Sequence, residues 1–152
     1  MTRHDTAQPM ELLIFKLGEQ EYSLDIMCVR EIRGWARATP MPRAPSYMRG
    51  VINLRGTVLP VMDLAERLDL PKCGQSERSV IVVVKHNGSL TGLLVDAVSD
   101  IIALGPDDLQ PPPEGALQDG PNVISALTLV DDRLVRILDL THIVVQPESD
   151  AA

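Results

Sequence analysis

The chain has 152 residues and a formal net charge of −7, and 45% of its residues are hydrophobic although only 3% are aromatic. A chain of this length buries about 70% of its unfolded surface, so we expect one domain, or two small ones, that fold without a disulfide or a metal. The negative charge repels phosphate backbones, and few aromatic side chains are present to stack against bases. Nucleic acid is therefore excluded as an expected partner.

No targeting or membrane-spanning segment is evident. The first ten residues lack the apolar stretch of a secretory signal, and no later run reaches the roughly 18 apolar residues that cross a bilayer. Cys28 and Cys73 have no second cysteine or histidine at metal-binding or redox spacing. We therefore expect a cytoplasmic protein with two free thiols, no direct membrane insertion, no cofactor and no metal.

The first predicted elements are strands. An apolar run over residues 11–16, a turn at 17–21 and a loosely alternating run over 22–29 together predict a β-hairpin. The segment that follows should be extended and irregular, because prolines disfavour a helix there. These prolines are Pro40, Pro42 and Pro45.

A second hairpin is predicted over residues 51–62, with a tight turn at 55–56. Pro60 cannot donate a hydrogen bond to a sheet ladder, so it should mark an edge strand or a bulge. Residues 63–66 (DLAE) fit a capping box, which predicts a short helix through Leu68.

The second half of the chain repeats this organisation. A β-branched run at 80–84 and an apolar run at 90–98 predict a hairpin, and a last hairpin is expected over 125–138 with its turn at 131–132. Between them, residues 105–122 form a long proline-rich loop, of the kind that lies on the surface and often carries function.

An internal repeat is the most informative pattern. Residues 56–64 (GTVLPVMDL) match residues 132–140 (DRLVRILDL) without a gap, 76 positions later, and residues 29–32 (VREI) match 98–101 (VSDI), 69 positions later. Two related halves of about five short strands each predict an all-β fold of two small closed barrels, because closure hides the strand edges. A groove between the barrels is then the expected binding site.

No catalytic motif is present. The histidines are not near a serine or cysteine in a nucleophile pattern, and no phosphate-binding or dinucleotide-binding glycine pattern occurs. Three aspartates each follow an apolar strand, and we expect them to cap the next turn by accepting backbone N–H groups, most clearly Asp63. We therefore predict that the chain is not an enzyme. The residues considered are His4, His86, His142, Asp63, Asp96 and Asp139.

Two charged residues occupy well-defined positions, Glu31 at a predicted strand end and Arg55 at a hairpin tip. Surface charges of this kind are usually solvated and contribute little. On a rigid scaffold they also suit partner recognition, because the planar guanidinium of arginine matches a carboxylate. The residues by themselves indicate a two-barrel binding module and do not name its partner.

An ordered series of segments resembles the CheW family of chemotaxis coupling proteins. The resemblance runs from residue 11 to about residue 145, in the family's order and spacing. A single NLRG would be a weak signal, whereas the ordered series is specific. The segments are 22–34 (YSLDI…VREIRG), 40–45 (PMPRAP), 49–64 (RGVINLRGTVLPVMDL), 91–96 (TGLLVD), 98–101 (VSDI) and 111–113 (PPP).

The resemblance implies one CheW-like domain over residues 11–146, made of two five-stranded SH3-like β-barrels packed together, with a short helix and a proline-rich loop. The two barrels are expected at approximately 11–70 and 78–146, and the sequence leaves open whether strands are exchanged between them. Residues 1–10 and 147–152 are expected to be flexible tails.

The resemblance also implies a non-enzymatic scaffold that couples methyl-accepting chemotaxis receptors to the histidine kinase CheA, at receptor arrays on the inner membrane face. The family's V-x-E-I motif and the arginine of N-L-R-G lie on the receptor-binding side, which here means Val29, Glu31 and Arg55. The CheW-like regulatory domain of the kinase is expected to pack around Val80 and Val98. If exposed, Val98 would be an apolar anchor; if buried, it belongs to the core.

One departure concerns a second kinase contact, of the kind that closes array rings. Some relatives carry an arginine just before the proline-rich segment and an aromatic residue just after its acidic residue. This chain has Gln110 and Gly115 at those places, which leaves the second contact open.

Two alternatives remain. The first is a coupling domain of a larger family member, such as the kinase or a receiver-fused coupling protein; because the chain ends about ten residues after the last predicted strand, we expect a stand-alone adaptor. The second is a small-molecule-binding double barrel, or an enzyme, that uses the groove between the barrels. Stabilisation by a metabolite or a metal would indicate it.

Overall fold

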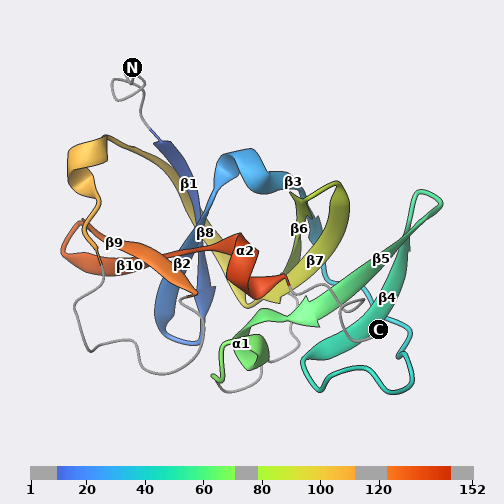
Figure 1. Cartoon of the computed structure of the whole chain (residues 1–152). Helices are drawn as coiled ribbons and strands as arrows, with labels where there is room; N and C mark the ends of the chain where they lie inside the picture. The colour runs from blue at the N-terminus through green and yellow to red at the C-terminus, as the bar shows by residue number, and fades with distance from the viewer. Residues whose placement is uncertain (1–9, 71–78, 112–122, 145–152) are drawn as a thin grey trace.

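The computed structural model describes residues 10–70, 79–111 and 123–144 (Figure 1). Strands make up most of this described part. They are β1 (Met10–Leu17), β2 (Gln20–Asp25), β3 (Val29–Gly34), β4 (Met48–Leu54), β5 (Thr57–Asp63), β6 (Val80–His86), β7 (Ser89–Val95), β8 (Ala97–Leu104), β9 (Ile124–Val130) and β10 (Arg133–Leu138). The short helices are α1 (Leu64–Arg67) and α2 (Leu140–Ile143), with 3-10 turns at Ile26–Cys28 and Pro106–Asp108.

The strands form two five-stranded sheets that lie side by side (Figure 1). Sheet A has the order β8-β1-β2-β10-β9, and sheet B has the order β3-β6-β7-β5-β4. Neighbouring strands are antiparallel, except for one parallel pair in each sheet, β10 with β2 and β5 with β7. The predicted all-β class with five strands in each unit is confirmed.

Each sheet takes strands from both halves of the chain. In sheet A, hairpin β1–β2 from the first half pairs with β8 and β10 from the second; in sheet B, hairpin β6–β7 from the second half pairs with β3 and β5 from the first. Neither sheet therefore coincides with residues 11–70 or with residues 78–146. The chain crosses between the sheets at Ile26–Cys28 and again at Asp96.

The internal repeat is preserved in the strand register. Val61 lies opposite Gly92 in the parallel pair of sheet B, and Ile137 lies opposite Ser23 in the parallel pair of sheet A. Val61 and Ile137 are 76 positions apart, and Ser23 and Gly92 are 69 positions apart, which are the two offsets found in the sequence. A Cβ atom on Gly92 would lie 2.8 Å from the Cγ2 atom of Ile81, so this position in sheet B favours glycine. In sheet A the buried Ser23 hydroxyl donates to a backbone carbonyl of β10 at 3.3 Å.

The predicted hairpins are present, but two runs are shorter than expected because the chain changes sheets. The first hairpin ends at Asp25, whose carboxylate accepts a hydrogen bond from the N–H two residues on, at 2.9 Å, and caps a 3-10 turn. The apolar run at 90–98 is divided at Asp96. Its backbone N–H donates to the carbonyl of Lys16 at 3.0 Å, and its carboxylate accepts from the N–H of Gly18 at 2.6 Å.

The second hairpin holds one correction and one confirmation. Pro60 does not lie on an edge strand or at a bulge, because β5 runs between β7 and β4 and the irregular pairing falls at the start of β4. Pairing with β7 begins one residue later, at Val61, so Pro60 lies outside that ladder. The predicted helix is confirmed, since the carboxylate of Asp63 accepts a hydrogen bond from the N–H of Glu66 at 3.2 Å.

A single apolar cluster joins the two sheets. It contains the fully buried side chains of Phe15 in sheet A, Ile81 in sheet B and Ile143 in α2. Arg67 links the helices, because its Nε and Nη2 atoms donate to the carbonyls of Ile143 and His142 at 3.1 and 3.0 Å. The two sheets therefore pack as one unit around a shared core.

Candidate functional site

Glu31 and Arg55 are brought together on the surface of sheet B. Glu31 lies within β3 rather than at a strand end, and Arg55 lies in the turn between β4 and β5 with a positive φ of 49°. The Nη2 atom of Arg55 donates to Oε1 of Glu31, and Nη1 lies 3.5 Å from Oε2. Arg33 adds a second, longer ion pair to the same carboxylate at 3.8 Å. The two charges are therefore paired with each other and are not independently solvated.

The pairing shifts the protonation of both partners. The hydrogen bond from Arg55 lowers the pKa of the Glu31 carboxyl, against a smaller opposing effect of desolvation, and nearby arginines add to the lowering. The same hydrogen bond raises the pKa of Arg55. Because the side chain of Arg55 is 68% exposed and that of Glu31 is 26% exposed, a partner has direct access to the pair.

Val29 packs against the core and not with the Glu31–Arg55 pair. It opens β3, pairs with Val84 and packs against the shared core, and a register shift separates it from Glu31. Exposed apolar side chains close to the pair in sequence are those of Ile32, which follows Glu31 in β3 and alternates with it along the strand, and Val58, three residues after Arg55; they are 42% and 69% exposed. Sequence reasoning did not single out either residue.

Val80 and Val98 are half-buried and pack against the shared core. Val80 pairs with Val95 at the start of β6, and Val98 pairs with Phe15 across β8 and β1. Val98 is therefore not a fully exposed apolar anchor. The prominent apolar side chain of β8 is that of Ile101, which is 52% exposed.

Four of the exposed apolar side chains form two pairs related by the internal repeat, and the repeat is the signal that could have identified these four. Ile32 and Ile101 are 69 positions apart, and both are exposed. Val58 and Leu134 are 76 positions apart, and both are exposed. Each sheet thus presents apolar side chains at equivalent places.

The proline-rich loop is only partly described. Gln110 pairs with Leu127 of β9 through two backbone hydrogen bonds of 2.8 and 2.7 Å, so it continues sheet A at that point. Some expectations fall on residues outside the described ranges. They concern His4, Cys73, Gly115, the prolines at 112 and 113, and the tails.

The aspartates considered as catalytic candidates have structural roles. Asp63 is fully buried, caps α1 and forms an ion pair with Nη2 of Arg49 at 2.8 Å. Asp139 caps α2 by accepting from the N–H of Thr141 at 3.0 Å. Within residues 10–70, 79–111 and 123–144, no three histidine, cysteine, aspartate or glutamate side chains are grouped to hold a metal ion. No helix in the same part of the chain is long and apolar enough to cross a membrane.

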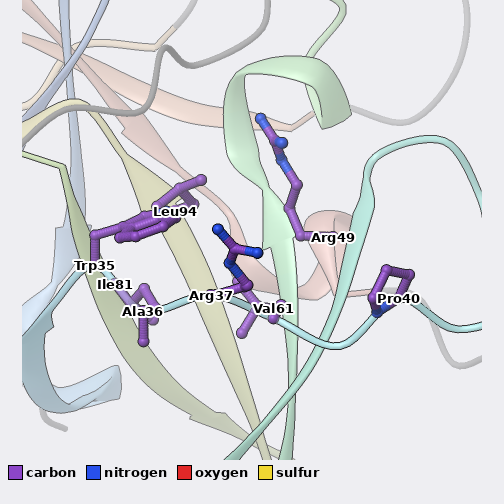
Figure 2. A pocket seen from close by; sticks show the side chains of 9 residues that line it. Trp35, Ala36, Arg37, Pro40, Arg49, Val61, Ile81 and Leu94 are labelled. Atoms are coloured by element: carbon purple, nitrogen blue, oxygen red, sulfur yellow. The ribbon is translucent and has the colours of Figure 1, made fainter.

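A pocket of about 350 Å³ opens in sheet B, beneath the segment that follows β3 (Figure 2). Val61, Ile81 and Leu94, from three adjacent strands, supply its apolar lining, and Trp35 and Arg37 come from the covering segment. A second pocket, between the β1–β2 turn and β10, is lined from sheet A. Each of these two pockets is thus lined from one sheet and not from a groove between the barrels.

Comparison with known proteins agrees with the architecture. The CheW-like domain family matches residues 11–148. The chain is 41% identical to "Chemotaxis protein CheW" of Rhizobium meliloti over 99% of this chain and 97% of that protein, and 44% identical to "Probable chemotaxis protein CheW" of Rhizobium etli over 93% and 92%. It also resembles the crystal structure of the scaffolding protein TtCheW from Thermoanaerobacter tengcongensis, with a TM-score of 0.80 and 34% identity over 86% of this chain and 89% of that one.

These similarities extend over both sheets and identify each as one SH3-like barrel of a scaffold protein rather than part of an enzyme. The repeat, the exchanged hairpins and the motifs around Glu31 and Arg55 lie within the matched region. The chain therefore belongs to the CheW-like domain family of chemotaxis scaffold proteins.

Proposed function

We propose that the chain couples methyl-accepting chemotaxis receptors to the histidine kinase CheA and works at receptor arrays on the inner membrane face. The observation that carries this proposal is the Glu31–Arg55 pair, an accessible, fixed pair of opposite charges at the motifs that the family uses for receptor binding. The same strands also carry exposed apolar side chains, those of Ile32 and Val58. Exposed charges and exposed apolar side chains on one sheet suit a protein partner, because charge gives specificity and apolar contacts give affinity.

The receptor side is tested by charge reversal. Arg55→Glu and Glu31→Lys should each weaken binding of a receptor-tip fragment roughly tenfold or more, about 1.4 kcal/mol, and leave binding of the kinase's regulatory domain unchanged. Arg43→Glu is the matched control, because Arg43 is likewise an exposed arginine with positive φ. Both affinities are measured by titration calorimetry after circular dichroism shows an unchanged fold.

The double variant Glu31→Arg/Arg55→Glu separates recognition from local structure. This variant can still form an ion pair within the chain, but the positive charge is now at position 31 and the negative charge at position 55. Receptor binding should remain weak, because the charges now face the partner with the wrong sign. Recovery of receptor binding would show that the pair only shapes the hairpin, and the proposed receptor contact would then be wrong.

The kinase side, around Val80 and Val98, needs a gentler change than a charge. Because Val98 packs against the core, Val98→Arg is expected to unfold the chain and is uninformative about binding. Val98→Thr keeps the shape and adds a hydroxyl, so a kinase contact there should weaken while receptor binding stays unchanged. Equal loss of both partners by a folded Val98→Thr protein would contradict the two-surface arrangement.

A further inference from the structure

The pocket in sheet B is built into the backbone. The segment after β3 is fixed to β4 by two hydrogen bonds between Thr39 and Val51, of 2.8 and 2.9 Å. Gly50 allows this approach, since a Cβ atom there would lie 2.1 Å from the carbonyl oxygen of Thr39, and its φ is +136°. The covering wall is thus held at a set distance from the strands, and the pocket of about 350 Å³ lies beneath it.

The charged side chains that line the pocket, Arg37 and Arg49, are both arginines, in a chain of net charge −7. Residues 26–62, the segment between Asp25 and Asp63, carry six arginines and one acidic residue, Glu31, which is paired with Arg55 and Arg33. No acidic side chain lines the pocket. The local charge therefore favours an anion.

The two arginines that line the pocket have different roles. Arg49 is paired with the buried carboxylate of Asp63 at 2.8 Å, and Figure 2 shows its guanidinium turned away from Arg37. Within the described part of the chain, no side chain or carbonyl forms a hydrogen bond or ion pair with Arg37. Arg37 is exposed, and in the view of Figure 2 its guanidinium lies between Trp35 and Arg49. Its donors are available to a ligand.

The apolar lining specifies the rest of the ligand. Val61, Ile81 and Leu94 are core residues, 2% exposed or less, and Trp35, which is 38% exposed, forms a wall beside Leu94 (Figure 2). The three core side chains therefore form a buried floor, and the apolar surface that a ligand can reach is mainly that of Trp35. An exposed indole ring favours an apolar or aromatic body, and a guanidinium fork favours a carboxylate. The volume lies at the lower end of ligand pockets, roughly 300–1,000 Å³, which indicates a small ligand.

We propose that this pocket binds a small monocarboxylate with an apolar body, with the carboxylate on Arg37 and the body against the exposed ring of Trp35, above the buried floor formed by Val61, Ile81 and Leu94. The site lies within one sheet and is separate from the Glu31–Arg55 pair.

The experiment uses the fluorescence of Trp35, which is the only tryptophan in the chain and lines the pocket. Phenylacetate is titrated into the full chain with excitation at the red edge of the tryptophan band, where phenylacetate does not absorb, and calorimetry gives an independent affinity. We expect a saturable change with one site. Phenylacetamide, its neutral counterpart, should bind at least roughly tenfold more weakly, because a charge-assisted hydrogen bond is lost.

Two variants test the location of the site. Arg37→Gln should weaken phenylacetate binding roughly tenfold or more, whereas Arg30→Gln, an exposed arginine of the same basic segment outside the pocket lining, should leave it unchanged. Ala38→Leu should weaken binding by filling the pocket. Absence of saturable binding by the unmodified chain, equal binding of phenylacetamide, or full binding by folded Arg37→Gln and Ala38→Leu proteins would each overturn the proposal.

Discussion

The repeat offers a matched pair of helix caps whose removal should have unequal effects. Asp63 and Asp139 are 76 positions apart and cap the equivalent helices α1 and α2. Their surroundings differ. Asp63 is fully buried and also forms an ion pair with Arg49 at 2.8 Å, whereas the Asp139 side chain is 37% exposed and has His142 only at 3.7 Å.

The magnitudes follow from these contacts. Loss of a helix cap lowers the free energy of unfolding by about 0.5–2 kcal/mol, and loss of a hydrogen bond to a charged group by about 1.5–3 kcal/mol. Together these losses should lower the free energy of unfolding of Asp63→Ala by about 2–4 kcal/mol. The loss stays below that for a fully buried unpaired charge, because the side chain of Arg49 is 28% exposed and regains some contact with water. Asp139→Ala should remove only about 0.5–1 kcal/mol.

Urea denaturation of the two variants, followed by circular dichroism, measures the difference. At an unchanged dependence on urea, the midpoint of Asp63→Ala should fall well below that of Asp139→Ala, and its melting temperature should drop by about 5–15 °C. Asp63→Asn keeps an acceptor for the N–H of Glu66 but loses the charge, so its urea midpoint should lie between those of Asp63→Ala and Asp139→Ala. Equal destabilisation by Asp63→Ala and Asp139→Ala would show that the buried ion pair contributes nothing to stability.

Two further predictions concern the backbone and the surface pair. Gly50→Ala should destabilise the chain by more than about 1 kcal/mol and disrupt the pairing of Thr39 with Val51, because the new Cβ atom would collide with the carbonyl oxygen of Thr39. Gly34→Ala, which has open space at its Cβ position, should have a much smaller effect. Similar urea midpoints for the two variants would contradict this prediction. Arg55→Gln should raise the pKa of Glu31 towards its ordinary value, measured by NMR titration of the carboxyl carbon. An unchanged pKa of Glu31 in the Arg55→Gln protein would refute the assigned cause. In the unmodified chain, the lowered pKa of Glu31 means that the pair stabilises the fold at pH values above the unfolded-state pKa. This stabilisation is lost as the pH falls through the folded-state pKa.

Much of the local structure could be predicted from the sequence because short-range chemistry decides it. The turn at 55–56 and the capping box at 63–66 depend on residues within a few positions of one another, and both are confirmed. The capping bond of Asp25 is also local, but the change of sheet that follows it, and the break at Asp96, could not be predicted in this way. Both carboxylates act where the chain changes sheets, and the partner of Asp96 is Gly18, 78 positions away.

The candidate site shows the same division. Glu31 and Arg55 could be identified as fixed charges, but only the folded sheet shows that they pair with each other. Val98 could be identified as the valine of a repeated motif, yet its packing against the core depends on β1, which reaches sheet A from the other half of the chain. The pocket under Trp35 was not predicted, because its lining comes from three strands and a segment that has no regular pattern.

The sequence by itself determined the all-β class, the hairpins, the caps, the two related halves and the membership of the family, since each depends on residue order and spacing. Only the tertiary structure decided which half supplies which strands to each sheet. A period-two pattern tells which face of a strand is apolar, but not which sheet covers that face. Because the two halves are related, hairpins β1–β2 and β6–β7 have similar apolar faces. Whether each hairpin pairs with strands of its own half or of the other half therefore depends on contacts between residues far apart in the chain.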